Sequence, residues 1–156
     1  MQKAGALLAR RPYSTGELRA KLQKLGTEEE VETTLARLES LGLLNDVEYA
    51  YNFASWRIKE MAWGGAKVHH SLVRRHVPPR LAESAIDRVH REISEDLVLS
   101  RYLDKLRKRS GMPKDRKAIQ KLASHLRSRG FQEDRIWNAL HERIPTSTWR
   151  SYDTGE

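Results

Sequence analysis

The chain has 156 residues, which is enough for one domain or for several small units that share a core, but not for two large independent domains. It contains no cysteine, which excludes disulfide bonds and thiolate metal sites, and its 29 basic and 21 acidic residues give a formal charge of +8. Near its N-terminus no apolar run is long enough for a signal peptide or a spanning helix, so we expect a cytoplasmic protein that does not enter membranes.

Apolar side chains recur at helical spacing along the whole chain, and no segment alternates as a half-buried β-strand does. Capping residues or first-turn prolines mark helix starts at Ser14, Thr27, Asn45 or Asp46, Pro78 with Pro79, and Ser94. Ser14 and Thr27 are each followed three residues later by glutamate, which is the capping-box pattern. The sequence therefore predicts an all-α protein of about nine helices.

Three segments of the chain align as an internal repeat of about 50 residues. The matched positions are Leu18, Val68 and Leu122, then Leu22, Leu72 and Leu126, then Gly26, His76 and Gly130. We predict three-helix repeats at residues 1–45, 46–93 and 94–144, followed by a polar tail at 145–156 that is disordered. Units this small need their neighbours to bury apolar surface, so the repeats are expected to stack into an elongated, curved right-handed or open solenoid.

The third position of each match is predicted to be a tight corner between two helices. Gly26 and Gly130 suit a left-handed backbone conformation, which glycine adopts without a Cβ penalty. Phe131 is expected to fold back onto the preceding helix. His76 in the middle copy is predicted to adopt the same left-handed conformation at a higher cost.

Basic residues recur at equivalent repeat positions and increase toward the C-terminus, where residues 94–156 hold 14 basic and nine acidic residues. None coincides with an apolar position, so stacked repeats would carry an exposed basic stripe. The candidate binding residues are Lys24, Lys67, Arg74, Arg75, Lys121, Arg127 and Arg129. Such a stripe favours an anionic partner, although basic residues near helix C-termini also stabilise the helix dipole.

A second basic cluster, residues 101–121, holds nine basic residues against two acidic ones. It is either a contact surface or the solvated side of two helices. Among the tryptophans, Trp56 and Trp137 have the spacing of core residues. Trp63 and Trp149 are less constrained, and base stacking remains open for them.

Catalytic and cofactor motifs are missing from the sequence. The six histidines lack carboxylates at metal-ligand spacing, and no phosphate-binding loop or nucleophile elbow is present, so we expect neither an enzyme nor a cofactor. The corner "WGGAK" from Trp63 to Lys67 can either hold an anion at a helix N-terminus or form a flexible turn.

Four segments resemble the bacterial RecX regulatory proteins: "ALLARRPYSTGELRAKL", "LESLGLLNDVEYAYNF", the two-glycine corner before "KVHHSLVRRHV", and "LRSRGFQEDRIWNAL". The resemblance implies three tandem three-helix repeats and a non-enzymatic modulator of the RecA recombinase, and we expect this protein to be a monomer. Such a protein would bind the RecA filament on single-stranded DNA and inhibit filament growth, ATP hydrolysis and co-protease activity, with contacts to single- or double-stranded DNA. The alternative is an autonomous nucleic-acid-binding helical module.

Overall fold

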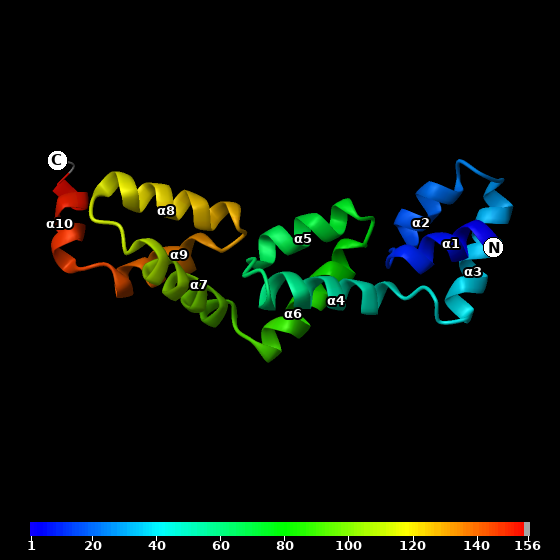
Figure 1. Cartoon of the computed structure of the whole chain (residues 1–156), viewed down its shortest axis with the longest axis horizontal. Coiled ribbons are helices and arrows are strands. Elements are labelled where there is room, and N and C mark those ends of the chain that lie inside the picture. The colour runs from blue at the N-terminus through cyan, green and yellow to red at the C-terminus, as the bar shows by residue number, and fades with distance from the viewer. Residues whose placement is uncertain (155–156) are drawn as a thin grey trace. The chain divides into compact units, whose positions relative to one another are not determined.

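The structure is a computed structural model that describes the backbone of residues 1–154 and the side chains of residues 1–150. All secondary structure in this part of the chain is helical (Figure 1), which confirms the predicted fold class. The helices are α1 (Gln2–Arg10), α2 (Thr15–Leu22), α3 (Glu28–Ser40), α4 (Asp46–Lys59), α5 (Gly65–Arg74), α6 (Pro79–Glu92), α7 (Glu95–Ser110), α8 (Arg116–Ser128), α9 (Glu133–Arg143) and α10 (Thr146–Thr154). Three helices fall within each predicted repeat range, although the division into repeats stays a prediction.

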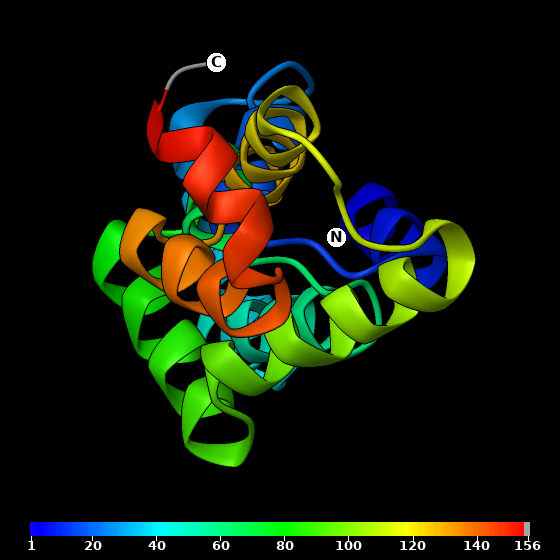
Figure 2. The ribbon, with the colours of Figure 1, turned by 90° about the vertical axis from the view of Figure 1, so that its left-hand side faces the viewer.

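The segment expected to be a disordered tail forms α10, so the prediction of disorder is wrong for Thr146–Thr154. Trp149 explains the difference, because its side chain is only 8% exposed. Its ring stacks on His141 with 3.9 Å between centroids and meets Trp137 edge-on at 6.2 Å. Figure 2 shows α10 in red against α8. Residues 155 and 156 of the predicted tail lie outside the described residues.

The chain forms two compact units. The first consists of Met1–Ser55 with His69–Arg88, and the second consists of Trp56–Val68 with Val89–Glu156. The first unit has a core of apolar side chains from α1, α2, α3 and their connections: Ala4, Tyr13, Leu18, Leu22, Val31, Leu35, Leu38 and Leu44.

The predicted helix starts are confirmed by their hydrogen bonds. Ser14 and Thr27 each form a complete capping box with the glutamate three residues later. Asn45, rather than Asp46, caps α4, because its Oδ1 accepts a hydrogen bond of 3.2 Å from the Glu48 amide. Asp46 accepts instead from the amide of Thr15, at 2.7 Å.

Helices α3, α5 and α8 end alike. A residue at positive φ is followed by an apolar residue whose amide donates to a carbonyl of the same helix. The positive-φ residues are Gly42, His76 and Gly130. At the last corner the Phe131 amide donates to the Leu126 carbonyl at 3.3 Å, and Phe131 is 3% exposed. The predictions for Gly130, Phe131 and the left-handed His76 are therefore confirmed.

Gly26 does not form the corner predicted for it, because its φ is not positive. Helix α2 already ends at Leu22, and the chain turns through a hydrogen bond of 2.9 Å from the Leu25 amide to the Leu22 carbonyl. Thr27 then begins α3, so the first connection uses a capping box where the other two copies use a left-handed residue.

The prediction of a core position is wrong for Trp56, which is 57% exposed. The buried face of α4 is formed by Ala50, Ala54 and Ile58, each 0% exposed and four residues apart, and Trp56 lies between them on another face. Trp137 is half-buried rather than fully buried, and its Nε1 donates to Glu133 at 2.8 Å.

Candidate basic interface

In the first unit, two of the three predicted cations are exposed: Lys24 in the turn after α2 and Arg74 in the last turn of α5. Arg75 is half-buried. Its guanidinium carbon lies 4.8 Å from the centre of the Phe53 ring, and its carbonyl accepts the hydroxyl of buried Ser14. The prediction of an exposed side chain is therefore wrong for Arg75, and Lys24 and Arg74 remain as contact candidates in this unit.

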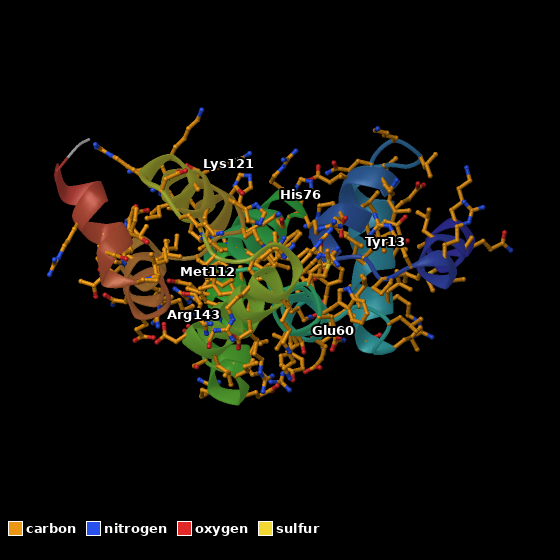
Figure 3. All side chains as sticks on the ribbon, turned by 60° about the vertical axis from the view of Figure 1, so that its left-hand side comes forward. Tyr13, Glu60, His76, Met112, Lys121 and Arg143 are labelled. Atoms are coloured by element: carbon orange, nitrogen blue, oxygen red, sulfur yellow. The ribbon has the colours of Figure 1, made fainter. Side chains whose placement is uncertain are left out.

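In the second unit, Lys121 (Figure 3) and Arg127 are both exposed on α8. Arg127 is paired with Glu133 through two contacts, at 2.5 Å from Nε and 3.0 Å from Nη2. An exposed pair of this kind stabilises a protein by at most about 1 kcal/mol, so a stronger anionic partner can replace the carboxylate. Lys121 forms no ion pair with any described residue.

Arg129 is half-buried and supports the chain's own backbone. Its Nε donates to the Ala62 carbonyl at 3.2 Å, and its Nη2 donates to the Met61 carbonyl. Its guanidinium carbon lies 4.4 Å from the centre of the Tyr102 ring. The prediction that Arg129 lies on an exposed stripe is therefore wrong. Its guanidinium binds backbone carbonyls of the corner that precedes α5.

Lys67 lies in the two-glycine corner and is also half-buried. Its ammonium nitrogen is 4.2 Å from the centre of the half-buried Trp63 ring. The Gly64 amide donates to the Arg129 carbonyl at 2.7 Å, and a Cβ on Gly130 would collide with Lys67. The corner is a packed junction with the end of α8 and not the flexible turn that the glycines suggested.

The N-terminus of α5 already holds an anion, which is the chain's own Glu95. One Glu95 oxygen accepts from the Gly65 amide at 2.7 Å, and the other lies 3.1 Å from Nε of Arg135. Glu95 is only 7% exposed. The sequence indicates Glu95 only as part of a helix start, since no local pattern points to a partner 30 residues earlier in the chain.

We refer to residues 101–121 as the α7–α8 basic segment. All nine of its basic residues are exposed: Arg101, Lys105, Arg107, Lys108, Arg109, Lys114, Arg116, Lys117 and Lys121. Both of its acidic residues have other partners. Asp104 accepts from Arg143 at 2.5 Å and lies 3.7 Å from Arg107, and Asp115 caps α8 by accepting from the Ala118 amide at 2.8 Å.

Tyr102, which lies within this segment, and His125, which follows it, join α7 to α8. The Tyr102 hydroxyl and His125 Nε2 are 2.6 Å apart. Burial lowers the pKa of His125 below its ordinary value of 6.5, and the positive charges of Arg129 and Lys67 lower it further. No sequence motif indicates the contact between these two side chains.

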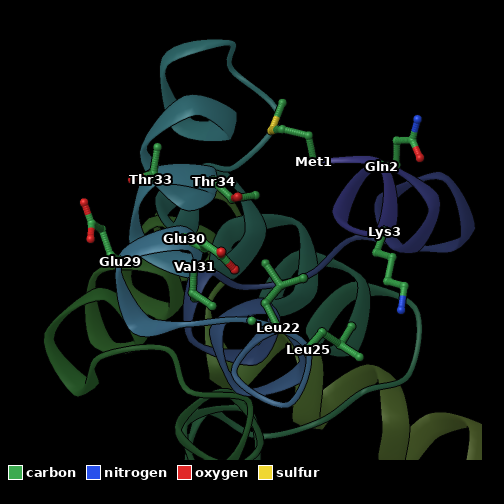
Figure 4. A pocket seen from close by; sticks show the side chains of 11 residues that line it. Met1, Gln2, Lys3, Leu22, Leu25, Glu29, Glu30, Val31, Thr33 and Thr34 are labelled. Atoms are coloured by element: carbon green, nitrogen blue, oxygen red, sulfur yellow. The ribbon is translucent and has the colours of Figure 1, made fainter.

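A cavity of about 720 Å³ lies in the first unit (Figure 4). Its lining includes apolar Leu22, Leu25 and Val31 together with the carboxylates Glu29 and Glu30. Lys3 also lines the cavity, so charges of both signs border its apolar wall and it has no basic surface for the anionic partner that the basic residues favour.

Within the described residues, no group of histidines and carboxylates is arranged to hold a metal ion. None of the described helices is both long enough and apolar enough to span a bilayer.

Comparison with known proteins gives matches along nearly the whole chain. A family model described as "RecX, first three-helix domain" matches residues 1–38. The Regulatory protein RecX of Prosthecochloris aestuarii is 32% identical over 145 residues, which cover 92% of this chain and 93% of that protein. The Regulatory protein RecX of Pseudomonas tolaasii is 35% identical over 139 residues, which cover 88% of this chain and 86% of that protein.

Among solved structures, the crystal structure of RecX from Lactobacillus salivarius is similar to this chain with a TM-score of 0.78. The alignment covers 90% of this chain and 92% of that one at 21% sequence identity. At this identity the likeness concerns the fold alone, and it agrees with the all-helical architecture.

Proposed function

The chain belongs to the RecX family of regulatory proteins, and on that premise we propose that it binds the RecA recombinase filament on single-stranded DNA. Binding there inhibits filament growth, ATP hydrolysis by the recombinase and its co-protease activity. The observation that carries the proposal is the match to a regulatory protein RecX over 92% of the chain.

Exposed basic side chains support this proposal in each compact unit. Lys24 and Arg74 in the first unit, and Lys121 and Arg127 in the second, are available to an anionic partner. A filament that contains DNA is such a partner, because phosphate groups attract cations and steer association. The proposed regulator inhibits by occupying the filament, so it requires binding surfaces and no catalytic residues or cofactor.

The test is the single-strand-dependent ATPase of the cognate RecA with this protein added below stoichiometry. We expect the wild-type protein to slow ATP hydrolysis and shorten filaments. The combined variant Lys24→Glu and Arg74→Glu should need a several-fold higher concentration for the same effect. Its matched control is Arg37→Glu with Arg80→Glu, which changes the charge equally at exposed positions outside the candidate set. If the wild-type protein changes neither ATPase nor filament length, the proposal is wrong.

The second candidate function is an autonomous nucleic-acid-binding helical module. It is favoured by the exposure of all nine basic residues of the α7–α8 basic segment. Tight binding to one duplex sequence, together with no effect on RecA, would establish this candidate in place of the first.

A further inference from the structure

We propose that the α7–α8 basic segment binds the phosphate backbone of DNA and is the surface through which this protein contacts nucleic acid. The inference rests on the proposed function, because it assigns the surface through which the proposed RecA regulator contacts DNA. It can nevertheless be tested without the recombinase, because it concerns the affinity of this chain for DNA alone.

The positive charge of this segment has little compensation within the protein. Seven of its basic residues form no ion pair with any residue in the described part of the chain: Arg101, Lys105, Lys108, Arg109, Lys114, Lys117 and Lys121. The two acids that could compensate them, Asp104 and Asp115, are held by Arg143 and by the start of α8. The segment therefore presents its charge to solvent or to a partner.

Helix stability does not explain this arrangement. Arg107, Lys108 and Arg109 in the last turn of α7 do complement the helix dipole. Arg116 and Lys117 have the opposite effect, because they occupy the first turn of α8, where the dipole is positive, and the N-cap carboxylate of Asp115 balances only one of their two charges. The positive charges of Arg116 and Lys117 therefore lower the stability of α8. Such a cost is expected where basic residues bind an anionic partner.

Like charges also follow one another at helical spacing along both helices. On α7 they are Arg101, Lys105 and Arg109, and on α8 they are Lys117 and Lys121, each four residues from the next. Residues four apart lie on one face about 6 Å from each other, so each row repels itself and lowers the stability of its helix. A linear polyanion with regularly spaced phosphates relieves this repulsion along the whole row.

The exposed surface of the segment favours nucleic acid over an acidic protein. Protein interfaces are centred on buried aromatic or aliphatic anchors, whereas DNA-binding surfaces are polar and strongly positive. The exposed large apolar side chains of the described residues include none between residues 101 and 121. An acidic protein would find charge here but no apolar anchor.

The experiment compares two full-length variants that each lose five positive charges. The α7–α8 variant replaces Lys105, Lys108, Lys114, Lys117 and Lys121 with glutamine. The matched control replaces Lys3, Arg10, Arg37, Arg80 and Arg91 with glutamine, all of them exposed and outside the candidate set. Circular dichroism and thermal melts establish that both variants fold. Fluorescence anisotropy with a labelled single strand and its duplex then measures affinity over a range of salt concentrations.

We expect the α7–α8 variant to lose at least about tenfold in affinity at low salt, and the control to lose much less. For a single strand each phosphate contact contributes about 0.7 to the slope of log affinity against log salt, so the variant's slope should flatten by up to about 3.5. Equal losses in the two variants would show that only net charge matters and would overturn the proposal. Absence of DNA binding by the parent protein would overturn it as well.

The RecA ATPase assay separates this inference from the proposed function. If the α7–α8 variant loses DNA affinity and the parent protein inhibits RecA, both proposals hold. If the parent protein inhibits RecA and the variant binds DNA normally, only the DNA-contact proposal fails. If the parent protein binds DNA through this segment and does not affect RecA, only the proposed function fails.

Discussion

Arg127 and Arg129 lie two residues apart at the end of α8, yet their guanidinium groups have different partners. Arg127 is exposed and pairs with Glu133, while half-buried Arg129 donates to two backbone carbonyls and lies over Tyr102. We expect Arg129→Ala to lower the free energy of unfolding by about 2 kcal/mol, because it leaves the partly buried Ala62 carbonyl without a donor and removes the guanidinium from the Tyr102 ring. Arg127→Ala should lower it by less than about 1 kcal/mol.

Urea unfolding of the two variants beside the parent protein measures the difference. Arg127→Ala is the matched control, since it removes the same side chain from the same end of α8. Equal destabilisation by the two substitutions would contradict the structural assignment of Arg129. A charge-reversal experiment on the basic surface should therefore leave Arg129 intact, because loss of the fold would otherwise resemble loss of binding.

His125 predicts a pH dependence of stability. Its pKa in the folded protein lies below 6.5 because of burial and the neighbouring charges of Arg129 and Lys67. As the pH falls below about 6.5, the unfolded chain takes up this proton before the folded protein does, so the free energy of unfolding decreases. His125→Gln, whose amide can still contact the Tyr102 hydroxyl, should lose less melting temperature between pH 7.5 and pH 5.5. Parallel losses in variant and parent would exclude His125 as the cause.

Two glycines that align in the sequence have different roles at the ends of their helices. Gly130 has a φ of 93°, and a Cβ there would collide with the backbone of Lys67. Gly26 does not have a positive φ, and a Cβ there would approach only the flexible carboxylate of Glu30, at 2.7 Å. Gly130→Ala should therefore cost about 3 kcal/mol or more through backbone strain and overpacking. Gly26→Ala should change stability by less than about 1 kcal/mol, as chemical denaturation of both variants will test.

Features that depend on nearby residues could be predicted from the sequence. The capping boxes at Ser14 and Thr27 and the corner at Gly130 each involve residues within one or two helical turns. The roles of Glu95 and Arg129 could not be predicted, because their partners are 30 and more than 60 residues away and are backbone groups without a sequence signature.

The side chains at the edge of a helix face were the least predictable. The helical spacing of Trp56 suggested a core position, but α4 is buried along Ala50, Ala54 and Ile58. Small residues allow close packing of a helix, and a hydropathy pattern gives large aromatic residues more weight than alanines. Trp56 was predicted to be buried for this reason. The prediction that Arg75 is exposed failed because the pattern of apolar residues does not define the full width of the buried face. A basic residue outside that pattern can still be half-buried, as Arg75 is.

At the scale of the whole molecule, the charge of +8 is concentrated rather than spread. Residues 94–156 carry 14 basic and nine acidic residues, an excess of five, and nine of the basic residues belong to the α7–α8 basic segment. Concentrated like charge destabilises the folded protein through self-repulsion, and salt screens this repulsion over distances of about 10 Å at 0.1 M. The stability of this protein should therefore depend on ionic strength.

We expect the melting temperature of the parent protein to rise as sodium chloride increases from low to moderate concentration. At low salt the α7–α8 variant should melt above the parent protein, because its rows of like charge are gone, and it should gain less from added salt. Salt also weakens exposed ion pairs, but none of the five lysines replaced in this variant forms an ion pair with a described residue. The difference between variant and parent protein therefore isolates the repulsion.

The matched control should behave more like the parent protein, since its five charges are dispersed. Equal salt responses in all three proteins would show that the segment is not strained by its charge, and would remove one argument for its binding DNA.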